Sequence, residues 1–134
     1  MVKGAQMIRM AVVAGALAAL AQVAGAQGQL PSGQDVMLTE VLAEPMPDGL
    51  WLRLRFLAPA IGVGTLDFDT ATGDMHALCR AVGLPMLRTD HPQAVGIIVS
   101  LSDRAVEFGV SDPEATQFFE AYRVQGDDCI WEEF

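Results

Sequence analysis

Two arginines and a tryptophan alternate along a short stretch of the chain, between Leu50 and Leu57. Trp51, Arg53 and Arg55 follow one another at every second position. In a β-strand such residues point to one face and lie about 6.6 to 6.8 Å apart. Two guanidinium groups at that spacing can clamp a carboxylate or a phosphate, or lie flat on an aromatic ring. The pattern makes these three residues candidates for binding a small anion. The alternative is that the arginines pair with carboxylates of this acidic chain.

Two histidines, His76 and His91, are the only side chains whose ordinary pKa suits general acid–base catalysis near neutral pH. Both are expected to be solvated, His76 on a helix outside its apolar stripe and His91 in a loop. No serine occupies a G-x-S-x-G nucleophile elbow. A small enzyme using His76 or His91 with a carboxylate is therefore the alternative to a non-catalytic binding protein. A cleft holding one of them beside a carboxylate would favour the enzyme, whereas an aromatic patch around Trp51 or Trp131 would favour partner binding.

Alternating acids at Asp67 and Asp69 begin like a calcium-binding loop. The glycine expected at the sixth position is absent, and Leu78 stands where the closing bidentate glutamate belongs. The acids are better explained by capping of a helix N-terminus. We predict no metal site and no cofactor.

Cys79 and Cys129 are the only cysteines, fifty positions apart. In a small domain, an even pair predicts a disulfide if the chain is exported, because compartments outside the cytoplasm are oxidising. A redox or metal-binding role is the alternative, but neither cysteine belongs to a C-x-x-C motif or a Cys/His cluster.

The N-terminus has the three regions of a secretory signal peptide. Lys3 and Arg9 precede an uncharged run, Met10 to Val23, which ends on the small residues Ala24-Gly25-Ala26. The run is short and rich in alanine and glycine for a membrane span. We therefore expect residues 1–26 to be cleaved, with a retained anchor as the alternative. The mature protein would be periplasmic or secreted, with no stable membrane insertion.

Cleavage would leave a 108-residue chain with six arginines, no lysine and 17 acidic residues, a formal net charge of −11. This balance opposes binding to nucleic acids and to anionic membranes. Solubility is the general explanation for such a charge, and a cationic partner is the more specific one.

Hydrophobic periodicity predicts a strand at 36–44, a turn, and a strand at 50–57 with its even-numbered residues facing the core. A helix at 70–82 is expected to be capped by Asp69 or Thr70 and stopped by Gly83 and Pro85. A central strand follows at 95–101, and residues 105–108 can pair back onto it.

The C-terminal third is consistent with two structures. Residues 113–124 fit a helix, but one helical turn at 113–116 followed by a hairpin of strands 118–124 and 129–134 fits better. The expected fold is α+β: a mostly antiparallel sheet with one main helix, about 70–82, packed across it and stapled by one disulfide. We expect a flexible lead-in at 27–34 and a single domain at 35–134.

Several stretches also resemble a family of small exported bacterial proteins of unknown function. They are Pro31 to Gln34, Arg53 to Phe56 with Ala58-Pro59, Ile98 to Arg104, Gln117 to Arg123 and Cys129 to Glu132. The resemblance implies a single exported domain and carries over no activity. The sequence therefore favours a soluble exported non-catalytic binding or accessory module, whose partner is an unknown protein or a small anionic ligand.

Overall fold

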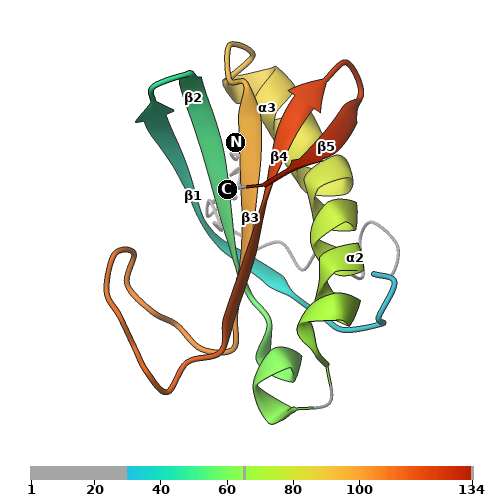
Figure 1. Ribbon diagram of the computed structural model, residues 1–134, viewed down its shortest axis with the longest axis vertical. Coiled ribbons are helices and arrows are strands. Elements are labelled where there is room, and N and C mark those ends of the chain that lie inside the picture. The colour runs from blue at the N-terminus through green and yellow to red at the C-terminus, as the bar shows by residue number, and fades with distance from the viewer. Residues whose placement is uncertain (1–29, 65, 134) are drawn as a thin grey trace, which may run out of the picture.

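Five strands form one sheet in the order β1-β2-β3-β4-β5, and the helices lie against it (Figure 1). The computed structural model describes residues 30–64 and 66–133. In chain order the elements are β1 (Met37–Met46), β2 (Gly49–Leu57), η1 (Pro59–Val63), α2 (Phe68–Leu78), η2 (Cys79–Gly83), α3 (Leu84–Asp90), β3 (Gly96–Ser102), β4 (Gln117–Gln125) and β5 (Asp128–Glu132).

The sheet is mostly antiparallel, as predicted, with one parallel pair. β1 pairs with β2, β3 with β4 and β4 with β5 in antiparallel fashion, whereas β2 and β3 run parallel. A parallel pair needs a long crossover connection, and the helical segment between β2 and β3 supplies it. The hairpins turn at Gly49 and Gly126, whose φ angles of 140° and 58° suit glycine.

The main helix is longer than predicted. It begins at Phe68, and its cap is Asp67 rather than the predicted Asp69 or Thr70. The Asp67 carboxylate accepts a hydrogen bond from the Thr70 N–H at 2.9 Å. It then continues to Asp90 through a π-helical turn, η2, and α3.

The predicted stop at Gly83 and Pro85 is therefore wrong. In the wider turn of η2 the Leu84 N–H donates to the Cys79 carbonyl, five residues back. The wide turn lets the helix accommodate Pro85. This proline lies in the first turn of α3, where its missing N–H costs little. Gly83 serves packing instead, since a Cβ there would lie 3.0 Å from Ile97.

The core lies between the helices and one face of the sheet. Leu52, Leu54 and Phe56 of β2 point into it, as their alternation predicted. The remaining contributors come mainly from the helical segment and from β3, and include Met75, Leu78, Leu84, Leu87, Ile97, Val99 and Leu101.

The opposite face of the sheet is not simply solvated. Trp51, Ile98 and Ala121 form a small buried cluster there. Trp51 is only 4 % exposed and donates its indole N–H to Asp48 at 2.9 Å, so this tryptophan is a packing residue.

The described residues before β1, 30–36, are held against the helix. Leu30 is buried, and Ser32 and Gln34 both donate hydrogen bonds to the fully buried carboxylate of Asp74 on α2. Within the expected lead-in at 27–34, residues 30–34 thus pack against the helix.

The connection between β3 and β4 differs from the prediction. Residues 105–108 do not pair back onto β3, and in place of the helical turn at 113–116 there is a turn at residues 113–114. Instead residues 103–116 form a long loop, seen in orange at one end of the sheet (Figure 1). The predicted C-terminal hairpin is confirmed as β4 and β5.

Cys79 and Cys129 form the predicted disulfide, which joins the end of α2 to β5. Within residues 30–64 and 66–133, no helix has both the length and the apolar character needed to cross a membrane. The expected signal peptide, residues 1–26, lies outside the described residues.

Candidate functional site

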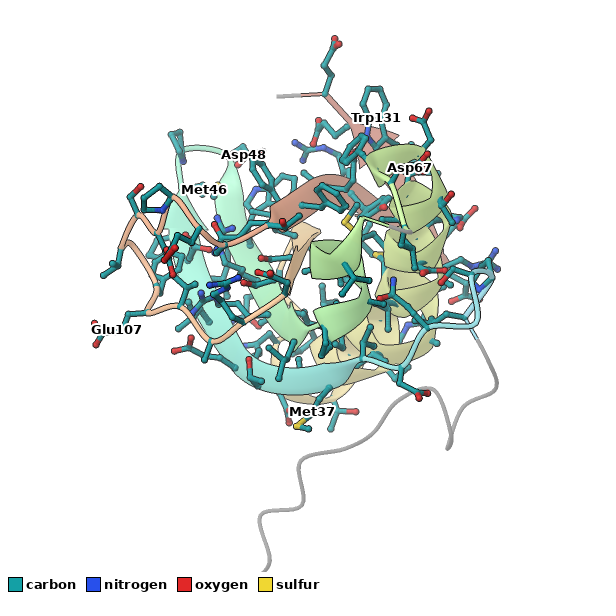
Figure 2. All side chains as sticks on the ribbon, turned by 90° about the horizontal axis from the view of Figure 1, so that it is seen from below. Met37, Met46, Asp48, Asp67, Glu107 and Trp131 are labelled. Carbon is teal, nitrogen blue, oxygen red and sulfur yellow. A yellow bond between two sulfur atoms is a disulfide. The ribbon has the colours of Figure 1, made fainter. Side chains whose placement is uncertain are left out.

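A groove of about 520 Å³ lies between α2 and the β4–β5 hairpin. We call it the aromatic groove. Figure 2 shows Trp131 at this side of the molecule, close in the view to Asp67 at the start of α2, with Glu107 of the long loop at the far side. Its walls come from three elements: Phe68, Thr72 and His76 of α2, Glu120 and Tyr122 of β4, and Trp131 of β5.

Helix and strand periodicity bring these residues together. The three α2 residues are four positions apart, which places them on one side of the helix. Glu120 and Tyr122 are two apart on β4 and share a face, and Trp131 pairs directly with Tyr122 across the hairpin.

The rim of the aromatic groove is strongly apolar and open to solvent. Trp131 is 57 % exposed and Phe68 is 42 % exposed, although side chains of this size are usually more buried. Phe68 is held by an edge-to-face contact with Phe118, with ring centroids 5.3 Å apart. The indole N–H of Trp131 donates to the carboxylate of Glu120, which fixes the orientation of the exposed ring.

His76 is half-buried in the wall of the groove, so the expectation that it is solvated is wrong. Its Nε2 lies 3.1 Å from the Cys129 carbonyl oxygen, and its ring centroid lies 5.6 Å from that of Tyr122. A carbonyl only accepts, so Nε2 must carry the hydrogen, and in the neutral ring Nδ1 is left as the basic nitrogen. His76 therefore links α2 to β5 beside the disulfide.

No hydrogen bond joins a histidine to a carboxylate in the part of the chain that the structure describes. His91 follows the last residue of α3, away from the groove lining. The site thus contains the histidine and the carboxylate that an enzyme would need, without the direct contact that orients a catalytic pair.

Burial strongly raises the pKa of Tyr122, and the negative charge of Glu120 raises it further. The phenol is therefore neutral at physiological pH. Glu120 is then the formally charged group in the lining of the aromatic groove.

The structure brings Arg53 and Arg55 together on the face opposite the helices, as predicted. Arg53 forms an ion pair with Glu44 at 2.5 Å, and Arg55 pairs with Glu40 at 2.7 Å. Both guanidinium groups also lie over the ring of Phe108, at 5.2 and 5.5 Å from its centroid. The alternative, that these arginines pair with carboxylates of the chain, is confirmed.

The long loop covers part of this arginine face. Arg55 donates to the Val106 carbonyl at 2.6 Å, and a second cavity of about 520 Å³ lies between the loop and β2. Arg55 and Arg104 line this cavity together with Glu40 and Glu107, so its formal charges balance. Trp51 belongs to the buried cluster and does not line the cavity.

Ion pairing extends to every arginine in residues 30–64 and 66–133. Each of the six lies within 4 Å of an aspartate or glutamate. Glu120 belongs to none of these pairs.

In the calcium-like stretch that starts at Asp67, the acids Asp67 and Asp74 have structural roles. A hydrogen bond from the Thr70 backbone lowers the pKa of Asp67, as expected for a helix cap, and Asp74 is buried against Ser32 and Gln34. Over the described ranges 30–64 and 66–133, no three His, Cys, Asp or Glu side chains gather as a metal site would require.

Of the residues that line the aromatic groove, only Trp131 was predicted from the sequence as part of a possible aromatic binding patch. One usable signal was the four-residue spacing of Phe68, Thr72 and His76, which marks a second stripe on the helix beside the apolar one. The pairing of that stripe with β4 and β5 depends on tertiary structure.

Comparison with known proteins adds a family but no activity. The chain matches a family of unknown function, DUF6497, over residues 10–134. No curated protein and no solved structure gives a significant match. Because the match spans nearly the whole chain, this protein belongs to the family of unknown function DUF6497.

Proposed function

We propose that this protein is an exported, non-catalytic binding module that takes up its ligand in the aromatic groove. The observation that carries the proposal is the exposure of Trp131 and Phe68 on either side of a concave surface of about 520 Å³. Grooves of this size with apolar walls and few polar groups are typical ligand sites.

Export is supported by the pattern of residues 1–26 and by the disulfide, which persists in oxidising compartments. Intact-mass analysis of the protein secreted by its native host tests it. We expect a mature N-terminus at Gln27 or within a few residues of it. A cell-associated protein that retains Met1 to Ala26 would contradict export by cleavage.

The rigid connection between the two walls of the groove also supports a binding role. The disulfide and the hydrogen bond from His76 both tie α2 to β5, so the two walls are held before any ligand arrives. Such preorganisation lowers the entropic cost of binding.

An NMR fragment screen on the ¹⁵N-labelled mature protein tests the groove. We expect binding fragments to shift the amide signals of residues lining the groove, and the shifts to disappear in Trp131→Ala. Phe108→Ala is the matched control, because it removes another exposed aromatic ring from the opposite side of the sheet. Hits that gather under the loop 103–116, or hits that survive Trp131→Ala, would refute the assignment.

A small enzyme using His76 is the second candidate, because His76 and Glu120 line the same groove. His76→Gln separates the two roles: its amide N–H can still donate to the Cys129 carbonyl, but it cannot act as a base. If the protein is a binding module, we expect the His76→Gln variant to complement a gene deletion as well as the wild-type protein does. A folded variant that still binds fragments in the groove but fails to complement the deletion would favour the enzyme.

A further inference from the structure

We propose that the ligand of the aromatic groove is a small soluble organic cation carrying a quaternary ammonium group. This inference rests on the proposed function and specifies the chemistry of its ligand. It follows from the charges and the aromatic lining of the groove.

The charges in and around the groove favour a cation. Glu120 contributes a negative charge to the groove, and no arginine lines it. All six arginines of the described ranges pair with other acids, so none of them neutralises Glu120. Its identified hydrogen-bond donor is the neutral indole of Trp131. A cationic ligand would supply the missing positive charge.

The aromatic lining of the groove also favours a cation. Phe68 of α2 and Trp131 of β5 are exposed in the groove, and the nearly fully buried Tyr122 of β4 also lines it. Ring faces attract cations through their quadrupole, and the attraction is strongest for tryptophan. A quaternary ammonium group suits such a lining, because it is weakly hydrated and has no N–H that would be left without an acceptor.

The charge of the whole molecule has the same effect. The full sequence has a formal net charge of −9, and removal of residues 1–26 would make it −11. An acidic protein attracts cations and repels anions over distances of about 10 Å in 0.1 M salt. The long-range field and the local site thus favour the same sign of ligand.

The two tryptophans of the chain allow a direct measurement. Trp51 is buried on the opposite face and Trp131 is exposed in the groove, so a ligand-induced fluorescence change reports mainly on Trp131. Choline is the probe, and 3,3-dimethyl-1-butanol, which has the same shape without the charge, is its control. We expect choline to bind at least about tenfold more tightly than the neutral alcohol.

Two charge-neutralising variants test the role of the carboxylate. In calorimetric titrations we expect Glu120→Gln to weaken choline binding about tenfold. Glu107→Gln removes the same charge from the far side of the molecule (Figure 2) and should change the affinity less than about twofold. Unchanged unfolding temperatures would show that neither variant acts through folding.

The outcomes separate the two proposals. If choline and the neutral alcohol bind equally, or if Glu120→Gln leaves the affinity unchanged, the proposal of a cationic ligand is overturned. The groove would remain a binding site. Binding only to phosphocholine vesicles or to a lysine-rich peptide would overturn the small soluble ligand. A fragment screen with no groove-directed hit would instead overturn the proposed function itself.

Discussion

At the scale of single residues, Asp74 shows how a charge is accommodated in the core. Its carboxylate is fully buried on α2 and accepts from the Ser32 N–H, the Ser32 hydroxyl and the Gln34 amide. Buried charges are costly unless they are hydrogen-bonded, so these contacts are what permit the residue. They also order the chain just before β1.

We expect Asp74→Ala to lower the free energy of unfolding by about 2 to 3 kcal/mol, because it leaves the donors of Ser32 and Gln34 without an acceptor. Asp74→Asn should cost less, since the Gln34 amide can turn its unpartnered oxygen towards the new N–H. Urea denaturation of both variants measures this. An alanine variant as stable as the asparagine variant would contradict it.

Arg53 illustrates the same dependence on a partner at the surface. Its ion pair with Glu44 is partly shielded, with about one fifth of each side chain exposed. We expect Arg53→Glu to lower the unfolding free energy by about 1 to 2 kcal/mol, because it sets two carboxylates against each other across β1 and β2. Exchange of the two residues, Arg53→Glu with Glu44→Arg, should recover most of the loss.

Binding measurements on the exchanged variant also separate the two faces of the sheet. We expect it to bind choline as wild type does, because the arginine face lies away from the aromatic groove. If the exchanged variant folds and binds choline but has lost its biological role, the arginine face would be the functional site instead.

At the scale of elements, the disulfide and η2 act at one place. Cys79 is the first residue of the π-helical turn, and its partner Cys129 lies on β5. The bond closes a loop of about fifty residues, which in the chain-entropy account stabilises by up to about 4 kcal/mol.

We therefore expect the double variant Cys79→Ser with Cys129→Ser to unfold at a markedly lower temperature, and reduction of the wild type to have the same effect. Calorimetry with and without reductant measures the shift. Peptide mapping under non-reducing conditions should recover one cross-linked pair, and two free thiols in the native protein would contradict the disulfide.

Local pattern was sufficient to predict some elements and insufficient for others. The alternation of Leu52, Leu54 and Phe56 predicted β2 and its core face, because a two-residue period has one structural explanation. The predicted end of the helix was wrong because Gly83 and Pro85 are stop signals only in the local sequence. The contact of Gly83 with Ile97 and the wide turn of η2, which let the helix continue, depend on tertiary structure.

The residues predicted to bind a ligand, Trp51, Arg53 and Arg55, do not line the aromatic groove, and the reason is again tertiary structure. Periodicity placed Trp51 on the correct face but could not show that Ile98 and Ala121 would cover it. The groove depends on the pairing of β4 with β5 and on the disulfide, which together bring Trp131 to α2. Such long-range contacts leave little trace in a local sequence window.

At the scale of the whole molecule, acid should weaken the fold. Hydrogen bonds from Arg123, and then from Trp51, lower the pKa of Asp48 below its ordinary value of 3.8. Hydrogen bonds from Arg104, and then from the Thr116 backbone, do the same for Asp103. A carboxylate whose pKa is lower in the folded state stabilises the protein above its unfolded pKa, and the stabilisation is lost as the pH falls through the folded pKa.

We expect the unfolding temperature to fall below about pH 4, where these carboxylates take up protons. Asp48→Asn should reduce the acid dependence, whereas Asp90→Asn at the end of α3 serves as a control. Thermal unfolding followed by circular dichroism across this range measures it. A control variant that flattens the profile as much as Asp48→Asn would contradict the assignment.

The single parallel pair, β2 with β3, has a consequence for how the chain reaches this structure. Both hairpins close through short turns, but β2 and β3 are separated by the whole helical segment, and Leu54 must find Val99 across it. Closing a long loop has an entropic cost that is recovered only when the contacts beyond it form. We expect the two hairpins to form early and the joining of β2 to β3 to limit the folding rate, so that substitutions at this junction slow folding while those in the β4–β5 turn do not.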